Sequence, residues 1–139
     1  MWRANKPRGE DGNAIVEFVG VMVVIVVPAL ALLTGLATTT TVQLALEDAA
    51  RQSARAYVRA ESVYSGEARG REAASKAWTD RGMDEQLDLN FACSASPCLS
   101  PGATVTARAS ATVTVPIVGA ITLAGEQAMV VDQYRVVRP

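Results

Sequence analysis

The sequence predicts an α+β protein: a long N-terminal membrane-spanning helix, a second helix, and then a small three-stranded antiparallel sheet. Three observations support this prediction. Residues 18–46 contain no Asp, Glu, Lys or Arg, the next segment is rich in Ala, Leu, Arg and Glu, and apolar and polar residues alternate over residues 104–115. A chain of 139 residues has room for one small domain beside such a helix.

The composition narrows the classes of function. The chain has 13 basic and 14 acidic residues, two Cys and no His. Without His there is no His-based triad, general base or zinc site, and two Cys alone do not complete a four-ligand site. The near-zero net charge gives no sign of a nucleic-acid partner. We therefore expect a membrane-associated structural or assembly protein with no metal and no cofactor, and not an enzyme.

The centre of the uncharged segment, residues 18–37, reads FVGVMVVIVVPALALLTGLA. A membrane-spanning helix needs about 20 mainly apolar residues, and this stretch supplies them. Pro28 lies within it and is compatible with a kinked membrane helix. A buried core helix is the alternative, but so small a chain has little with which to cover such a segment. We therefore expect the lipid bilayer to surround it.

The charges beside the span indicate its orientation. The short N-terminal flank carries Arg3, Lys6 and Arg8 against Glu10 and Asp11. Positive charge on a short flank favours a cytoplasmic N-terminus. We expect a single-pass protein of the cytoplasmic membrane whose C-terminal domain is extracytoplasmic.

Two helical segments are expected after the span. Residues 43–60 are predicted to continue the first helix, because strong helix formers dominate there. Four threonines, residues 38–41, weaken helix propensity and predict a flexible joint where the helix leaves the lipid. A break over residues 62–66 and a second helix over residues 67–81 follow, with Gly82 as its C-terminal cap.

A narrow stripe of mostly small side chains runs along the extension of the first helix. Such side chains allow a neighbouring backbone to approach closely. The sequence leaves open whether the stripe packs against a sister subunit or within the chain. It consists of Leu46, Ala49, Ala50, Ser53, Tyr57 and Ala60.

Three strands are expected in the C-terminal half, forming a sheet with one face on a helix. Residues 87–93 and 104–115 alternate with period two, and a third strand is predicted within residues 127–137. Residues 117–125, IVGAITLAG, are unusually apolar for a loop between two strands. Exposed, they would form a contact surface. We expect them instead to be buried under the sheet.

Cys93 and Cys98 are separated by four residues that include Pro97. This is not the redox spacing C-x-x-C, and a metal site would need further ligands. In an oxidising extracytoplasmic compartment the pair would form a disulfide. Closing so short a loop would contribute about 2 kcal/mol by the chain-entropy estimate. Two unpaired thiols are the alternative.

The junction between the basic leader and the apolar segment reads GNAIVEF, residues 12–18. A carboxylate at the start of an apolar helix is costly and points to function, unless the helix simply begins at Phe18 and leaves Glu17 at the headgroups. A cut after Gly12 would make Asn13 the new N-terminus. Glu17 would then lie one helical turn away, on the same face, where its carboxylate could neutralise the new amine on the same or a neighbouring chain.

This pattern resembles the processing site of type IV pilins and pseudopilins, where a prepilin peptidase cuts after the Gly on the cytoplasmic side. In that family the Glu at the fifth mature position aligns subunits during assembly, and the Glu17-Phe18 pair looks like that of the Flp, or tight-adherence, branch. The length of chain after the span is similar to the TadE-like family of minor pseudopilins. The Ala/Arg-rich residues 49–56, the Thr/Val-rich strand region and the closing residues 131–135 fit the same resemblance.

The resemblance implies three parts: a cytoplasmic leader (1–12), the membrane helix with its extracytoplasmic extension (13–60), and a small α+β domain (61–139). It implies prepilin peptidase, other pilin or pseudopilin subunits, the assembly platform and the lipid bilayer as partners. Two alternatives stay open. Residues 35–37, GLA, resemble a signal peptidase site that would release a secreted binding domain. An uncleaved bitopic envelope subunit is the other alternative.

Overall fold

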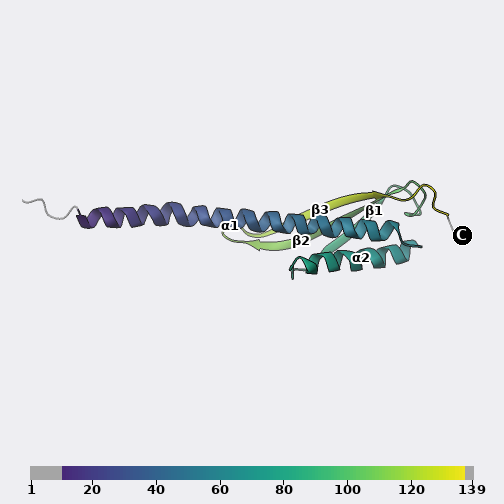
Figure 1. Ribbon diagram of the computed structural model, residues 1–139, viewed down its shortest axis with the longest axis horizontal. Coiled ribbons are helices and arrows are strands. Elements are labelled where there is room, and N and C mark those ends of the chain that lie inside the picture. Colours follow the sequence, from purple (N-terminus) through teal and green to yellow (C-terminus); the bar gives the residue numbers. More distant parts are fainter. Residues whose placement is uncertain (1–10, 137–139) are drawn as a thin grey trace, which may run out of the picture.

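The computed structural model describes residues 11–136. Figure 1 shows one long helix that projects far beyond a compact end, where a second helix and a sheet pack beside its C-terminal half. The α+β class and the expected order of elements are confirmed. The elements are α1 (Asp11–Val58), α2 (Val63–Asp80), β1 (Asp88–Cys93), β2 (Thr104–Val115) and β3 (Gly119–Val130).

The helix α1 is continuous through both positions where the sequence suggested a disturbance. Pro28 lies inside it, and the threonines at 38–41 form no flexible joint. Each of these four threonines donates its hydroxyl to a carbonyl one turn earlier, as Thr38 does to Thr34 at 2.9 Å and Thr41 to Ala37 at 2.9 Å. Thr can make such bonds because its Oγ1 reaches the carbonyl three or four residues before it. The expectation of a joint was therefore wrong.

The two halves of α1 have different surroundings. The N-terminal half extends away from the rest of the chain (Figure 1). The C-terminal half packs on β2, β3 and α2, and the small-residue stripe is buried there within the chain itself. This resolves the question that the sequence left open. The fully or almost fully buried residues of the stripe are Leu46, Ala49, Ala50, Ser53, Tyr57 and Ala60.

The helix α2 begins four residues earlier than expected. Ser62 and Ser65 form a reciprocal capping box, in which each hydroxyl accepts a hydrogen bond from the backbone N–H of the other. Ser-x-x-Ser departs from the usual Ser-x-x-Glu pattern, which explains why the sequence suggested a break here. Gly66 and Gly70 are buried in the helix because the rings of Tyr57 and Phe91 occupy the space where their side chains would lie.

The C-terminal end of α2 is capped at Gly82, as expected. Gly82 has φ +72°, and its N–H donates to Thr79 O at 2.9 Å while Met83 N–H donates to Trp78 O at 3.3 Å. This pair of bonds is the Schellman arrangement, in which a left-handed residue after the helix satisfies its last carbonyls. The turn also brings the indole N–H of Trp78 to Glu85 O at 2.8 Å.

The sheet has the order β1-β2-β3 with both pairs antiparallel. One face of β2 is apolar and covered by helices, whereas its threonines point mostly outward; Thr112 and Thr122 hydrogen-bond across the exposed face at 2.8 Å. The third strand differs from the expected range, because β3 occupies Gly119–Val130. Val131 still donates to Ala103 O and accepts from Gly102 N–H, just before β2. Most of the apolar 117–125 segment is therefore strand, and only residues 116–118 connect β2 to β3.

The β2–β3 hairpin lies along α1 and points toward its projecting half (Figure 1). At one end, a methyl group on Gly125 would come within 2.7 Å of Glu47 N and 2.8 Å of Leu46 C. At the other end, Val115 covers Gly35, whose added Cβ would lie 3.3 Å from Val115 Cγ1. From Gly35 to Glu47 the helix rises about 18 Å, and from Gly119 to Gly125 the strand rises about 20 Å. These similar lengths show that β3 runs nearly parallel to the helix axis.

We expect Gly125→Ala to lower the free energy of unfolding by about 1–3 kcal/mol, because the added methyl group meets backbone atoms that cannot rotate away. Chemical unfolding in detergent micelles, followed by the fluorescence of the buried Trp78, measures the change. Gly20→Ala is the matched control, since no atom lies within 4 Å of its added Cβ. Equal effects of the two substitutions would contradict the close approach of β3 to α1.

Candidate functional site: the apolar stem of α1 and its two ends

The projecting half of α1 is apolar on every side. We call residues 13–34 the apolar stem; all of them are exposed except the half-buried Ala31. Large apolar side chains are bare over its whole length, for example Ile15 at 68% and Val24 at 72% exposure. Its 22 residues would rise about 33 Å, against about 30 Å for the hydrocarbon core of a bilayer. The helix is thus long and apolar enough to cross a membrane.

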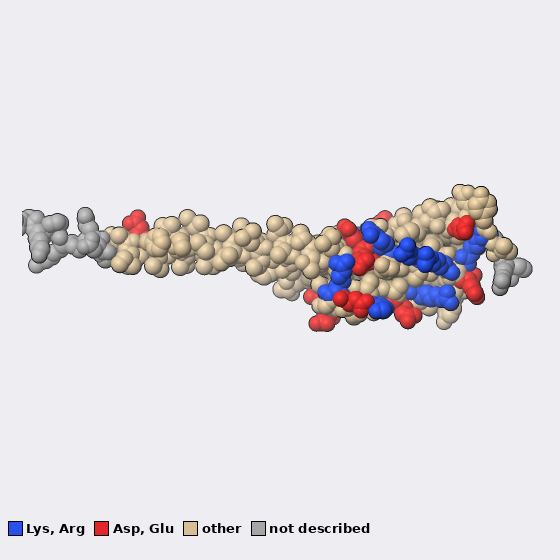
Figure 2. Space-filling model, viewed as in Figure 1, with Lys and Arg blue, Asp and Glu red and all other residues tan. Residues whose placement is uncertain are grey.

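The predicted processing residues lie at the free end of this stem. Gly12 and Asn13 belong to the first turn of α1, and Asn13, Glu17 and Phe18 are exposed. The first backbone N–H groups of a helix have no partner inside it, so this turn opens at little cost. Glu17 is the one charged residue between 13 and 46. Figure 2 shows an acidic spot near this end of the stem and then a long uncharged surface. The leader up to residue 10 lies outside the described residues.

The predicted disulfide is present at the opposite end of the molecule. Cys93, the last residue of β1, is bonded to Cys98, and their Cα atoms are 5.2 Å apart. Both residues pack against a small apolar cluster that includes Tyr57, Val105 and Val131. The bond ties the loop after β1 to this cluster, so its role is to hold the end of the domain.

Arg135 is a structural residue that the sequence did not reveal. Its guanidinium donates to Val58 O at 3.1 Å and also to Ala60 O. Val58 is the last residue of α1, whose final carbonyls lack helical partners, and Ala60 lies in the turn that follows. The contact joins residues 77 positions apart, so no local pattern could have indicated it.

An aromatic pair lies behind the same end of the domain. The rings of Tyr57 and Phe91 are 4.8 Å apart between centroids, and the Arg71 guanidinium lies 5.9 Å from the Phe91 centroid. Burial, and to a smaller extent the Glu67 carboxylate, raise the pKa of the Tyr57 hydroxyl. The neutral phenol is the form that suits this packed position.

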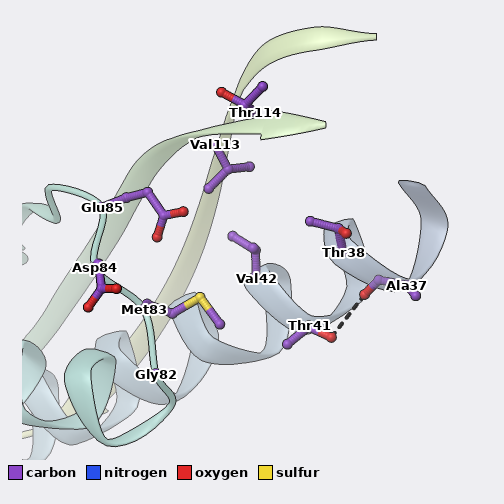
Figure 3. Close-up of a pocket in the computed structure, with 10 residues that line it drawn as sticks. All are labelled: Ala37, Thr38, Thr41, Val42, Gly82, Met83, Asp84, Glu85, Val113 and Thr114. Atoms are coloured by element: carbon purple, nitrogen blue, oxygen red, sulfur yellow. Dashed lines mark hydrogen bonds between the residues drawn. The ribbon is translucent and has the colours of Figure 1, made fainter. Parts of the chain in front are cut away.

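A shallow groove of about 430 Å³ lies where the stem meets the domain. Figure 3 shows Val42 and Val113 facing each other across it, with the Glu85 side chain extending toward the space between them. Asp84 and Glu85 come from the loop between α2 and β1 and are both exposed. No group of three or more Cys, Asp or Glu side chains is placed to hold a metal ion within residues 11–136. The groove therefore presents a mixed apolar and acidic lining. Its lining comprises Ala37, Thr38, Thr41, Val42, Gly82, Met83, Asp84, Glu85, Val113 and Thr114.

The turn between β2 and β3 lies beside this groove, at the end of the domain nearest the stem. Its residues were expected to be core, yet Ile117 is 81% and Val118 68% exposed. The later residues are covered: Ile121 and Leu123 pack partly against the core, and Gly125 is buried against α1. The expectation of burial was wrong for the turn. The hairpin extends beyond Val115, the last residue of β2, which packs against Gly35 of α1.

Comparison with protein-family models, with curated proteins and with solved structures finds no match to this chain.

We expect the double substitution Cys93→Ala with Cys98→Ala to lower the free energy of unfolding by about 2 kcal/mol, since the open loop gains entropy in the unfolded chain. Denaturant unfolding in detergent under non-reducing conditions provides the measurement. Reduction of the unsubstituted protein should give the same loss. An unchanged midpoint in both cases would show that the disulfide does not stabilise this end of the domain.

Proposed function

We propose that this chain is a pilin-like assembly subunit, of the TadE-like minor pseudopilin type, that serves a tight-adherence (Flp) type IV pilus. In this proposal prepilin peptidase removes the leader after Gly12, and the apolar stem then holds the subunit in the cytoplasmic membrane. The protein acts by packing with other pilin subunits and the assembly platform, and it carries out no catalysis.

The observation that carries the proposal is the position of the GNAIVEF junction. It lies at the free end of an uncovered apolar helix, and the same helix continues without a break into the folded domain. A subunit that is assembled through its membrane helix needs such continuity. A rigid helix transmits a force on its N-terminal end to the folded domain, and it keeps the domain at a fixed distance from that end. A flexible joint at the threonines would have lost that coupling.

Glu17 has the properties that an alignment residue needs. It is exposed, one turn from Asn13, and without a charged neighbour for the rest of the stem. A lone carboxylate at the edge of lipid gains strongly from a cation on an adjacent chain. The amine created by cleavage after Gly12 would be such a cation. Its pairing with Glu17 of another subunit would fix the register between two stems.

The continuity of α1 also bears on the secreted alternative. A cut after Ala37 would fall in the middle of the helix, between Gly35, which Val115 covers, and Val42, which belongs to the core. Such a cut would separate Gly35 from the domain whose Val115 covers it. An uncleaved bitopic subunit keeps all of these contacts. It differs from a processed pilin only in retaining the leader.

We expect Gly12→Leu to block processing and leave the full chain of 139 residues, whereas the unsubstituted chain is shortened to 127 residues. The physical reason is that a bulky side chain replaces hydrogen at the scissile bond. Intact mass of the membrane-extracted protein, after co-expression with a prepilin peptidase, measures the result. Gly20→Leu is the control, because it adds the same side chain at an open position of the stem. A mature form of 102 residues would instead support cleavage after Ala37.

We expect Glu17→Ala to be cleaved normally but to be lost from assembled pili, because the stem no longer offers a partner for the neighbouring amine. Sheared pilus fractions and membrane fractions are compared by immunoblotting. Glu61→Ala, which removes an exposed acid from the folded domain, should be incorporated like the unsubstituted chain. Full incorporation of the Glu17→Ala protein would argue against the alignment role.

A further inference from the structure

We propose that the tip of the β2–β3 hairpin, residues 116–118, enters the membrane surface beside α1 and gives the folded domain its own contact with lipid. This inference rests on the membrane anchoring in the proposed function, and it is independent of pilus assembly. It concerns Pro116, Ile117 and Val118, which we call the hairpin tip.

The side chains of the hairpin tip are poorly suited to water. Ile117 and Val118 expose most of their surface, as Val130 and Val136 do at the opposite end of the domain. Ile117 also has φ +72°, a left-handed conformation that β-branched residues rarely adopt and that Gly or Asn would adopt more readily. A polar turn residue would suit both the backbone and the solvent better. An apolar environment around the turn explains why isoleucine occupies position 117.

The hairpin tip, like the stem, belongs to a part of the chain without charged residues. Residues 109–125 of the hairpin contain no charged residue, and the first charges on its two strands are Arg108 and Glu126, which are register partners. On α1 the first charge after the stem is Glu47, whose backbone lies against Gly125. The charge-free parts of the helix and of the hairpin therefore end at the same level, although the acidic residues Asp84 and Glu85 of the loop after α2 lie nearer the stem.

The length of the stem then decides where the tip lies. Residues 18–34, between Glu17 and the first residue that the hairpin covers, rise about 26 Å. The hydrocarbon core is about 30 Å thick. With Glu17 at the headgroups, the hydrocarbon must extend about to Ala37, which is past Gly35. Because Val115 covers Gly35, the hairpin tip lies at the same depth as this part of the helix and is in contact with lipid.

The acidic loop limits how deeply the domain enters. Asp84 and Glu85 line the groove together with Thr41 and Val42, so their carboxylates lie near this level of the helix (Figure 3). Ionised carboxylates stay out of hydrocarbon. Between Gly35 and Thr41 the helix rises about 9 Å, which matches the depth of about 5–10 Å at which amphipathic elements rest in a membrane surface. The tip thus enters while the acids remain in water.

Lipid, rather than a second copy of the chain, is the occupant that these observations favour. The hairpin tip is continuous with the apolar stem and stands at the same level along α1. A bilayer surrounding the stem reaches the tip without any further partner. The tip also offers no charged group that a protein surface would have to match.

The test uses variants of the full chain that each carry one added cysteine, which is the only free thiol because the two native cysteines are bonded to each other. Ile117→Cys is labelled with an environment-sensitive fluorophore and placed, one copy per disc, in phosphatidylcholine nanodiscs with or without spin-labelled acyl chains. Val118→Cys is a second tip position should the first variant fail to fold. We expect the tip probe to lose at least about half of its emission to the spin label, as befits a position at the boundary of headgroups and acyl chains.

Two control positions separate the possible outcomes. Leu33→Cys, in the stem, should also be quenched, whereas Val130→Cys, an exposed valine at the other end of the same hairpin, should keep its emission. A quenched Leu33 probe with an unquenched tip probe would overturn this inference and leave the membrane anchoring intact. An unquenched Leu33 probe would overturn the anchoring as well. A tip probe that is shielded from water but not quenched by lipid would show that protein covers the tip, which also overturns the inference.

Discussion

The close packing of α1 against β3 and α2 determines where every other feature of the molecule lies. Ala45, Ala49 and Ala50 present almost no side-chain bulk, and Gly125 presents none, so the strand approaches the helix backbone itself. At this separation the long hairpin has to follow the helix axis. Its turn is thereby carried to the level of Gly35, and its charged end is carried to the level of Glu47.

One helix therefore has to suit two environments. In the stem every face is apolar and uncovered, as expected of a helix surrounded by lipid. Beyond Gly35 one face is small and buried while the opposite face carries arginines, as expected of a helix between a protein core and water. The threonines at 38–41 lie at the change between these patterns. Their hydroxyls are satisfied by the helix itself, so they suit a place where the surroundings change from lipid to water.

The sequence predicted the elements with a long, regular pattern and missed those that depend on distant contacts. The uncharged stem and the alternation in β2 needed no tertiary information, and the expected oxidising compartment indicated the disulfide. The strand β3 was misplaced because its apolar residues lack the strict alternation of β2, and its position follows from pairing with β2. The bond from Arg135 to the end of α1 and the fit of Gly70 against Phe91 join segments far apart in the chain. The processing residues were suggested by their order alone; the structure adds the exposed position of Asn13, Glu17 and Phe18 at the end of the stem.

The carboxylates at the two ends of the uncharged surface set how far the protein can slide in a membrane. From Glu17 to Thr41, the level of the acidic loop, α1 rises about 36 Å. The hydrocarbon core is about 30 Å thick, so both acidic levels can stand in the headgroups at once, with only a few ångströms to spare. The difference of about 6 Å is close to one helical turn, and any larger displacement would carry Glu17 or the pair Asp84 and Glu85 into hydrocarbon. The position of the domain along the membrane normal is thus limited by Glu17 at one end of the uncharged surface and by Asp84 and Glu85 at the other. In the proposed arrangement the hairpin tip enters lipid because it extends further toward the stem than the acidic loop does.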